Sequence, residues 1–485
     1  MRADRGAGGS VQGRVAGVAT QPTPYPGTDM AALHALLPAH KVPRIAPNVA
    51  RCPRCGAHSP RNEVRRLERH AACVDMEKKL AIEVGCYLCP ECPAGERWFR
   101  LQPVGFEERS RYTTQTRTMV VSLVKDHKLS FDGAAAVGRA LLHLPALAGT
   151  TVMRWFREAG DGVDYRGHLA RVAETFSGQL AIDEVYDGGF YVLKATDPLN
   201  GVELTSWLGE GNPSEADIRE LFLELKAAGI VPELVVTDGS RLYPEVISEV
   251  FPDAGHQRCV FHFIKRALEL LAPAFHGAVR SMPQPKKRKR GRPKKRGRPR
   301  KDKEKRANLR NVRKCRYLVF KRDGIDNKGR PRMSPSEEKA LAEALALCPP
   351  LAILRQFVGA LYELFGPTTV SQEVAERRRQ AILSDERFQE HAAIGKVVAH
   401  LADDALFTRL TRYLDFENAD KTSNHPEREN REFRKRQRSH YRLRSVVSMC
   451  AFLDLMLVRR DPPGEPRRLR RRRTTPAETL EVLAA

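Results

Sequence analysis

The segment from residue 177 to 265 restricts the fold most strongly, because its apolar residues follow the alternation typical of strands after a helical region. Three strand-like runs, separated by turn sequences at 187–189 and 199–201, predict an antiparallel meander. The elements expected next are a helix, a strand, a helix and a short strand, over 214–229, 232–239, 243–251 and 256–263. This order predicts an α/β domain built on a mixed sheet.

Two aspartates of this segment follow apolar runs. Asp183 comes after 180–182, and Asp238 comes after 234–237, so each is expected at the end of a strand. Strand ends in a sheet with parallel neighbours meet at one crevice, where two carboxylates would repel each other unless a divalent cation neutralised them. Mg²⁺ bound by carboxylates and phosphate oxygens fits such a site. Taken singly, each aspartate is equally typical of an ordinary turn.

Three sequence blocks resemble the catalytic blocks of DDE transposases, and above all those of the Mutator-like superfamily and related prokaryotic insertion-sequence enzymes. The blocks are AIDEVYDGG, VVTDGSRLYPEVISEVFPDAGHQRCVFHFIK and TSNHPERENREFRKRQR. The resemblance covers about 180–265 and 420–455 closely. The second block also contains Cys259-Val-Phe-His262, a Cys-x-x-His element that these families place shortly after their second aspartate. Cys259 and His262 are therefore expected to support the active site.

The resemblance implies that Asp183, Asp238 and Glu427 are the catalytic carboxylates and hold Mg²⁺ or Mn²⁺. The implied enzyme cleaves phosphodiester bonds at transposon ends and transfers the freed 3'-hydroxyl ends to target DNA. Glu427 has a second interpretation, because it lies three residues after Asn424 and could complete a capping box. The alternative function is a non-catalytic DNA-binding regulator derived from a transposase.

A cluster of cysteines precedes this region, with six of the ten cysteines between residues 52 and 92. Two C-x-x-C pairs with 33 residues between them can close a tetrahedral Zn²⁺ site. The expected ligands are Cys52, Cys55, Cys89 and Cys92. A competing set is Cys52, Cys55, His70 and Cys73, and reduced thiols without metal are a further alternative. The charged segment 61–83 between the pairs is expected to form an amphipathic helix.

Three short helices are predicted between residues 111 and 160, and together they resemble a helix-turn-helix. The third is expected to open on a threonine cap and to act as a recognition helix in a major groove. Its outward residues would be Thr150, Thr151 and Arg154, while Val152 and Trp155 pack inward. An ordinary helical hairpin is the alternative.

Basic residues outnumber acidic ones by 83 to 59, which gives a net charge of +24 and indicates a polyanionic partner. Segment 285–306 contains Arg-Gly-Arg-Pro twice and resembles an AT-hook that lays arginines along a narrow minor groove, although it could also be only a solvated linker. The arginines expected to contact DNA are Arg290, Arg292, Arg296 and Arg298 in this segment, and Arg431, Arg434 and Arg438 on the helix after Asn424.

We therefore expect a ribonuclease H-like mixed α/β sheet with a large helical insertion, preceded by a small zinc module and a helix-turn-helix. The expected divisions are a flexible leader (1–45), the zinc module (46–105), the helix-turn-helix (106–165), the first part of the catalytic core (175–265), an insertion (266–420) with a basic disordered linker (283–332), the final core helices (421–460) and a basic tail (461–485). The absence of an apolar span or secretory signal predicts a cytoplasmic, nucleoid-associated protein. Its expected partners are transposon ends and target DNA, bound by a homodimer or higher oligomer.

Overall fold

The computed structural model describes residues 42–108, 110–285, 300–326, 329–439 and 443–458. The chain divides into two compact units, Met1–Ala159 and Gly160–Ala485. Most of the predicted leader, the four predicted hook arginines and the basic tail lie outside the described residues. No helix within the described ranges is long and apolar enough to cross a membrane.

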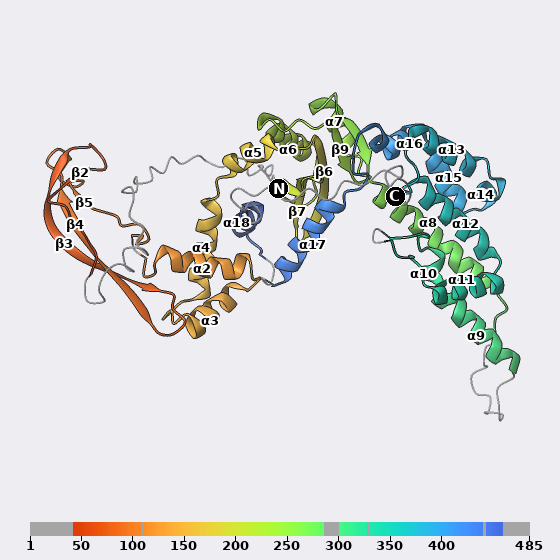
Figure 1. The fold of residues 1–485 in the computed structure, drawn as a ribbon, viewed down its shortest axis with the longest axis horizontal. Coiled ribbons are helices and arrows are strands. Elements are labelled where there is room, and N and C mark those ends of the chain that lie inside the picture. The colour runs from red at the N-terminus through yellow and green to blue at the C-terminus, as the bar shows by residue number, and fades with distance from the viewer. Residues whose placement is uncertain (1–41, 109, 286–299, 327–328, 440–442, 459–485) are drawn as a thin grey trace, which may run out of the picture. The chain divides into compact units, whose positions relative to one another are not determined.

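The first unit contains a five-stranded sheet built on a long antiparallel hairpin (Figure 1). Its strands are β1 (Arg44–Ile45), β2 (Val49–Arg51), β3 (His58–Ala71), β4 (Lys78–Leu88) and β5 (Trp98–Arg100). The helix predicted over 61–83 is therefore wrong, and the end of the predicted leader belongs to the sheet. Ile82, Val84 and Cys86 are buried on alternate positions of β4, which is the period of a strand. Leu67 and Phe106 pack against the first two and form a small core.

Three helices follow in this unit, as predicted: α2 (Thr114–Lys125), α3 (Phe131–Leu141) and α4 (Gly149–Asp161). Side-chain caps begin the first two, since Thr113 and Ser130 accept hydrogen bonds from backbone N–H groups of α2 and α3. The third helix begins at Gly149 and not on the predicted threonine cap. The expected faces of α4 are present, because Val152 and Trp155 are buried whereas Arg154 is exposed.

The second unit contains a mixed sheet with the strand order β10-β9-β6-β7-β8. Its strands are β6 (Gln179–Asp187), β7 (Phe190–Asp197), β8 (Val202–Glu210), β9 (Leu234–Thr237) and β10 (Gly255–Arg258). The first three form the predicted antiparallel meander, and β9 runs parallel to both β6 and β10. The helices α5 (Tyr165–Glu174), α6 (Glu215–Ala227) and α7 (Tyr243–Val250) contribute to the core of this sheet. The predicted mixed α/β class is confirmed.

The predicted strand over 256–263 is only half correct, because β10 ends at Arg258 and α8 (Val260–Ser281) begins two residues later.

Helices α9 (Arg300–Lys314) and α10 (Arg316–Val319) lie within the predicted linker 283–332, so that part of the linker prediction is wrong. Further helices are α11 (Pro335–Leu347), α12 (Pro350–Leu364), α13 (Gln372–Leu383), α14 (Glu386–Glu390), α15 (Ile394–Ala402) and α16 (Asp404–Thr411), with the 3-10 turn η1 (Arg412–Asp415).

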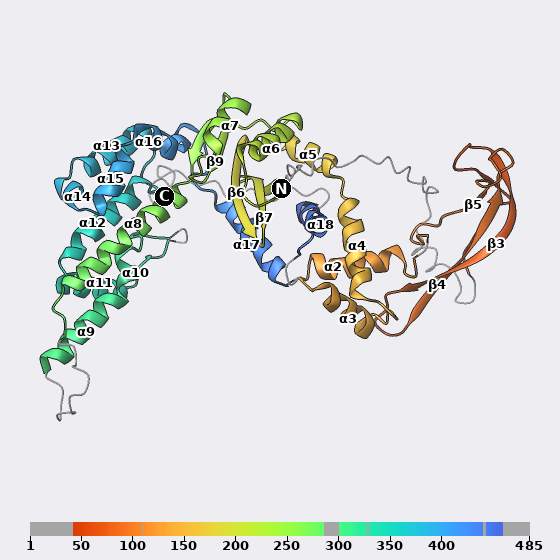
Figure 2. The ribbon, with the colours of Figure 1, turned by 180° about the vertical axis from the view of Figure 1, so that it is seen from behind.

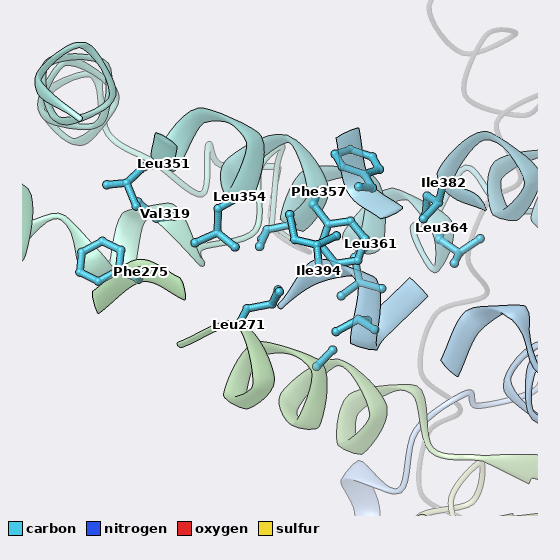
Figure 3. Packing of buried hydrophobic residues seen from close by; sticks show 14 of the residues in the cluster. Leu271, Phe275, Val319, Leu351, Leu354, Phe357, Leu361, Leu364, Ile382 and Ile394 are labelled. Carbon is cyan, nitrogen blue, oxygen red and sulfur yellow. The ribbon is translucent and has the colours of Figure 1, made fainter. Parts of the chain in front are cut away.

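These helices share one large apolar core that is separate from the core of the sheet. Figure 3 shows Leu271 of α8 pointing toward Leu354 and Phe357 of α12. All three side chains are almost fully buried. The predicted helical insertion is therefore a folded body with its own hydrophobic interior, to which α8 contributes buried side chains.

The last two helices of the described chain pack against this sheet. The helix α17 (Asn424–Ser439) packs against β6 and β7, and both views show it beside them (Figures 1 and 2). The helix α18 (Val446–Leu457) packs against β8. The sequence predicted that a helix beginning near Asn424 would return to this domain. This return brings Glu427 back to strands that lie more than two hundred residues earlier in the chain.

Candidate active site and cysteine cluster

The parallel pairing of β6 and β9 places Asp183 and Asp238 at the same level of the sheet. Leu180 lies opposite Val235 and Ala181 opposite Val236, so continuing this register by two residues brings the two aspartates opposite each other. Asp238 directly follows β9, as predicted, but Asp183 lies within β6. The strand continues to Asp187 because its other neighbour, β7, is antiparallel and pairs with it along this whole stretch.

The carboxylate of Asp183 is buried, with 8% of the residue exposed. The Nδ2 of Asn430 on α17 donates a hydrogen bond of 2.6 Å to its Oδ2. Burial raises the pKa of Asp183 to about 6, although the charge of His262 and the Asn430 hydrogen bond oppose the rise. The negative charges of Asp238 and Glu427 raise this pKa further. Asp238 and Glu427 therefore both lie close enough to Asp183 for their charges to act on its carboxylate.

Glu427 lies beside His262, with 3.5 Å between its Oε1 and the imidazole Nε2. A hydrogen bond with the Cys259 thiol raises the pKa of His262 to about 9, and the negative charges of Asp183 and Glu427 contribute to the rise. Burial opposes ionisation of Cys259, but hydrogen bonds with His262 and Ser423 outweigh it and lower the pKa of this thiol. The Cys-x-x-His pair is thus in direct contact with the candidate site.

The first turn of α17 bears on the capping-box interpretation of Glu427. The helix begins at Asn424, and the backbone N–H of Glu427 donates to the carbonyl of Ser423 at 3.2 Å. Glu427 is therefore the fourth residue of the helix, whereas the acidic residue of a capping box is the third. Its side chain points to His262 instead.

Sequence reasoning missed Glu184, which follows Asp183 on β6 and points to the opposite face of the sheet. The hydroxyl of Tyr243 on α7 donates a hydrogen bond of 2.7 Å to its Oε1. Burial and the charge of Asp238 raise the pKa of Glu184 to about 7. An ionisable residue inside an apolar strand was the only available signal, because Tyr243 lies 59 residues away.

The three candidate carboxylates are not gathered as tightly as a filled metal site. We looked among the described residues for His, Cys, Asp and Glu side chains whose ligand atoms all lie within 4.8 Å of one another. The group that meets this distance consists of cysteines and contains none of the three carboxylates. Asp183, Asp238 and Glu427 nevertheless offer the hard oxygen donors that Mg²⁺ prefers. A bound cation would relieve the repulsion that Asp238 and Glu427 exert on Asp183.

The cysteine cluster consists of Cys52, Cys55, Cys89 and Cys92, as the first of the two predicted sets proposed. One pair precedes β3 and the other follows β4, so the antiparallel hairpin brings them together. The Sγ of Cys55 lies 3.4 Å from that of Cys89 and 3.6 Å from that of Cys92, and 3.7 Å separates Cys52 from Cys92. Four sulfurs bound tetrahedrally at about 2.3 Å from zinc would be roughly 3.8 Å apart.

The competing set is not brought together. His70 and Cys73 lie at the opposite end of β3 from Cys55, near the turn that joins β3 to β4. The Nδ1 of His70 is 3.4 Å from the carboxylate of Glu77 in that turn. A strand rises about 3.3 Å per residue, so the length of β3 separates these side chains from the first cysteine pair.

The residues expected to contact DNA lie in both units. Arg431, Arg434 and Arg438 are exposed along α17, on the face that also carries Glu427. In the first unit, Thr151 is partly buried and Arg154 is exposed on α4, where the guanidinium lies 3.6 Å from the carboxylate of Glu158.

Comparison with known proteins connects the second unit to a family. Residues 204–282 match the model described as "Transposase, Mutator family". The chain carries a Mutator-family transposase segment. This segment runs from β8 into α8 and contains Asp238, Cys259 and His262, whereas Asp183 and Glu427 lie outside it. The resemblance to the Mutator-like superfamily is thereby confirmed, and the matched segment contains the second of the three sequence blocks.

Among solved structures, the chain is similar to the Drosophila P element transposase strand transfer complex. The identity is 12%, the match covers 73% of this chain and 94% of that chain, and the TM-score is 0.37. No match was found among curated proteins.

Proposed function

We propose that the protein is a DDE transposase that cleaves DNA at transposon ends and transfers the 3'-hydroxyl ends to target DNA. Asp183, Asp238 and Glu427 would be its catalytic carboxylates and the ligands of Mg²⁺ or Mn²⁺. The observation that carries the proposal is that Asp183 and Asp238 lie opposite each other on the parallel strands β6 and β9 and that Glu427 on α17 lies close enough to influence Asp183, in a chain with a Mutator-family segment. The sheet would then be a ribonuclease H-like core.

The donor set fits a hard divalent cation, because carboxylate oxygens dominate and burial, with a smaller contribution from the two neighbouring acidic charges, raises the pKa of Asp183. When bound, such a cation polarises the phosphate and lowers the pKa of an attacking water or hydroxyl. Asp183 and Asp238 would bind it from neighbouring strands, and Glu427 from α17. Asn430 fixes the orientation of the Asp183 carboxylate, while His262 keeps Glu427 close to the two aspartates.

Binding of DNA would involve several parts of the chain. Arg431, Arg434 and Arg438 on α17 would contact phosphates of the strand held at the carboxylates. Thr151 and Arg154 on α4 would read the transposon ends, and a zinc ion held by the four cysteines would rigidify the hairpin of the first unit. The functional form would be a homodimer or higher oligomer that holds two transposon ends.

The metal requirement separates this function from that of a DNA-binding regulator. The protein should be incubated with DNA that carries the inverted repeats flanking its gene, in Mg²⁺, in Mn²⁺ or in chelator. We expect nicking and strand joining only with metal, and DNA binding in all three conditions. Binding without any cleavage in either metal would contradict the proposal and favour the regulator.

The repeated Arg-Gly-Arg-Pro sequence at 290–293 and 296–299 would add minor-groove contacts. Replacing Arg292 and Arg298 by Ala should then weaken binding to A·T-rich DNA more than to G·C-rich DNA at matched salt, since only the former has the narrow groove. Equal losses on both duplexes would mean that the segment is merely a cationic tether.

A further inference from the structure

A pocket of about 570 Å³ lies beside the first turn of α17 in the second unit. Its walls come from the first half of α8, residues 316–322, α12 and residues 421–424. The volume falls within the range of roughly 300–1,000 Å³ that is typical of small-molecule sites. No residue of this pocket is among the three candidate carboxylates.

Aromatic rings form a large part of the pocket wall. Phe261, in the first turn of α8, is 42% exposed although its ring is apolar. The ring of Tyr362 is positioned by its hydroxyl, which donates to the backbone carbonyl of Phe320 at 3.3 Å. The guanidinium of Arg322 lies 6.0 Å from the centre of this ring. Flat rings and a guanidinium plane are the surfaces on which another flat ring stacks.

The charge around the pocket favours an anionic ligand. Lys265, Arg316 and Arg322 contribute to its lining, and the first two are exposed. Glu269 is the one acidic residue among the lining side chains, and its carboxylate is paired with Arg266 at 3.1 Å. A ligand with an apolar flat part and attached negative charges would match both the wall and the surrounding cations. A nucleobase with its flanking phosphates has this combination.

The pocket begins next to the candidate active site. Phe261 is adjacent to His262, whose Nε2 lies 3.5 Å from Glu427. Asn424 lines the pocket and precedes Glu427 by three residues on α17, a spacing that places two side chains on one helix face about 5–6 Å apart. A nucleotide next to a phosphodiester held at Glu427 would therefore reach the pocket.

We propose that this pocket receives an unpaired nucleobase of the DNA strand that is cut, from the nucleotide next to the cleavage site. The base stacks on Phe261 and Tyr362, and Lys265 and Arg322 contact the flanking phosphates. Removing this base from the duplex stack frees the adjacent phosphodiester, which then approaches the carboxylates without a clash with the opposite strand. The inference rests on the proposed function for the identity of the cut strand.

The test compares the affinities of the full-length protein for two duplexes in chelator, where no cleavage occurs. One carries the terminal sequence of the element with the nucleotide beside the cut left unpaired, and the other has an abasic residue at that nucleotide. We expect the first duplex to bind about tenfold more tightly, in line with the stacking of one base on aromatic side chains. Phe261→Ala should abolish this preference, and so should Phe261→Leu, which retains an apolar side chain but lacks the ring.

Tyr317→Ala is the matched control, because Tyr317 is an exposed aromatic residue of the same region that does not line the pocket. It should retain the preference, and so should Asp183→Asn. A preference that survives both Phe261 variants, or no preference in the original protein, would overturn the inference. A preference lost only at Phe261 in a protein that never cleaves DNA would instead refute the proposed function and leave the pocket assignment standing.

Discussion

The hydrogen bond from Asn430 to Asp183 joins residues that are 247 positions apart and fixes one candidate carboxylate from the helix that carries another. Replacing Asn430 by Ala removes this donor and leaves the carboxylate free to rotate. We expect cleavage of pre-bound DNA to slow by about 10–100-fold, as is usual when a residue that orients a metal ligand is lost. Single-turnover kinetics would measure the change.

Lys435→Ala is the control for this substitution, because Lys435 is exposed on the same helix. It should leave the cleavage rate of pre-bound DNA close to that of the original protein. If Asn430→Ala cleaves at the original rate, Asn430 does not position Asp183.

His256 on β10 predicts a pH dependence of stability. Burial lowers the pKa of His256 to about 4, with further lowering by Arg409 and Arg258. Because the unfolded chain binds this proton near pH 6.5, unfolding takes up a proton between about pH 6.5 and 4, and stability falls as the pH drops through this window. We expect this residue alone to destabilise the fold by about 2 kcal/mol at pH 5 relative to pH 7.

Urea unfolding at several pH values would measure this effect. His256→Gln should flatten the dependence between pH 6.5 and 4, whereas His276→Gln, at an exposed position of α8, should not. An unchanged pH dependence in His256→Gln would show that this imidazole is not the responsible group.

At the scale of elements, the β3–β4 hairpin brings four cysteines together, and their binding of zinc can be tested. If the four cysteines hold zinc, the full-length protein should contain about one zinc per chain. Cys55→Ser and Cys89→Ser should each lose most of the metal, while Cys73→Ser, from the competing set, should keep it. Metal analysis after gel filtration measures this directly. Loss of zinc in Cys73→Ser but not in Cys89→Ser would contradict the cluster seen in the structure.

The same hairpin shows where sequence patterns fail. Val64, Leu67 and Ala71 are spaced like one face of a helix, and the many charged residues around them fit a helix equally well. On β3, however, Val64 and Leu67 point to opposite faces. The alternation of Leu80, Ile82 and Val84 on the partner strand was the correct signal, but it spans too few residues to outweigh the charged segment before it.

The strands of the second unit were predictable because their apolar alternation and turn sequences agree. The end of β10 was not, since the apolar residues after Arg258 suit a strand as well as the first turn of α8. Tertiary pairing also decides that Asp183 lies within its strand, because only the antiparallel contact with β7 extends β6 past the aspartate.

For the whole molecule, the sequence could nominate the candidate carboxylates but not their contacts. Asp183, Asp238 and Glu427 were proposed from motifs. The register of β6 and β9 places the two aspartates opposite each other, and the helix that carries Glu427 packs against β6. The contacts of Asn430 and Tyr243 depend on side-chain packing between distant segments, which no local pattern encodes. The aromatic pocket likewise exists only because the helical insertion folds against α8.

The most direct test of the account is cleavage of pre-bound transposon-end DNA in Mg²⁺ by Asp183→Asn, Asp238→Asn and Glu427→Gln. Asp253→Asn, which removes an exposed carboxylate of the same unit, is the control. We predict that each of the three variants binds DNA like the original protein but does not cleave it, while the control cleaves normally. Cleavage at the original rate by any of the three would contradict its place in the active site.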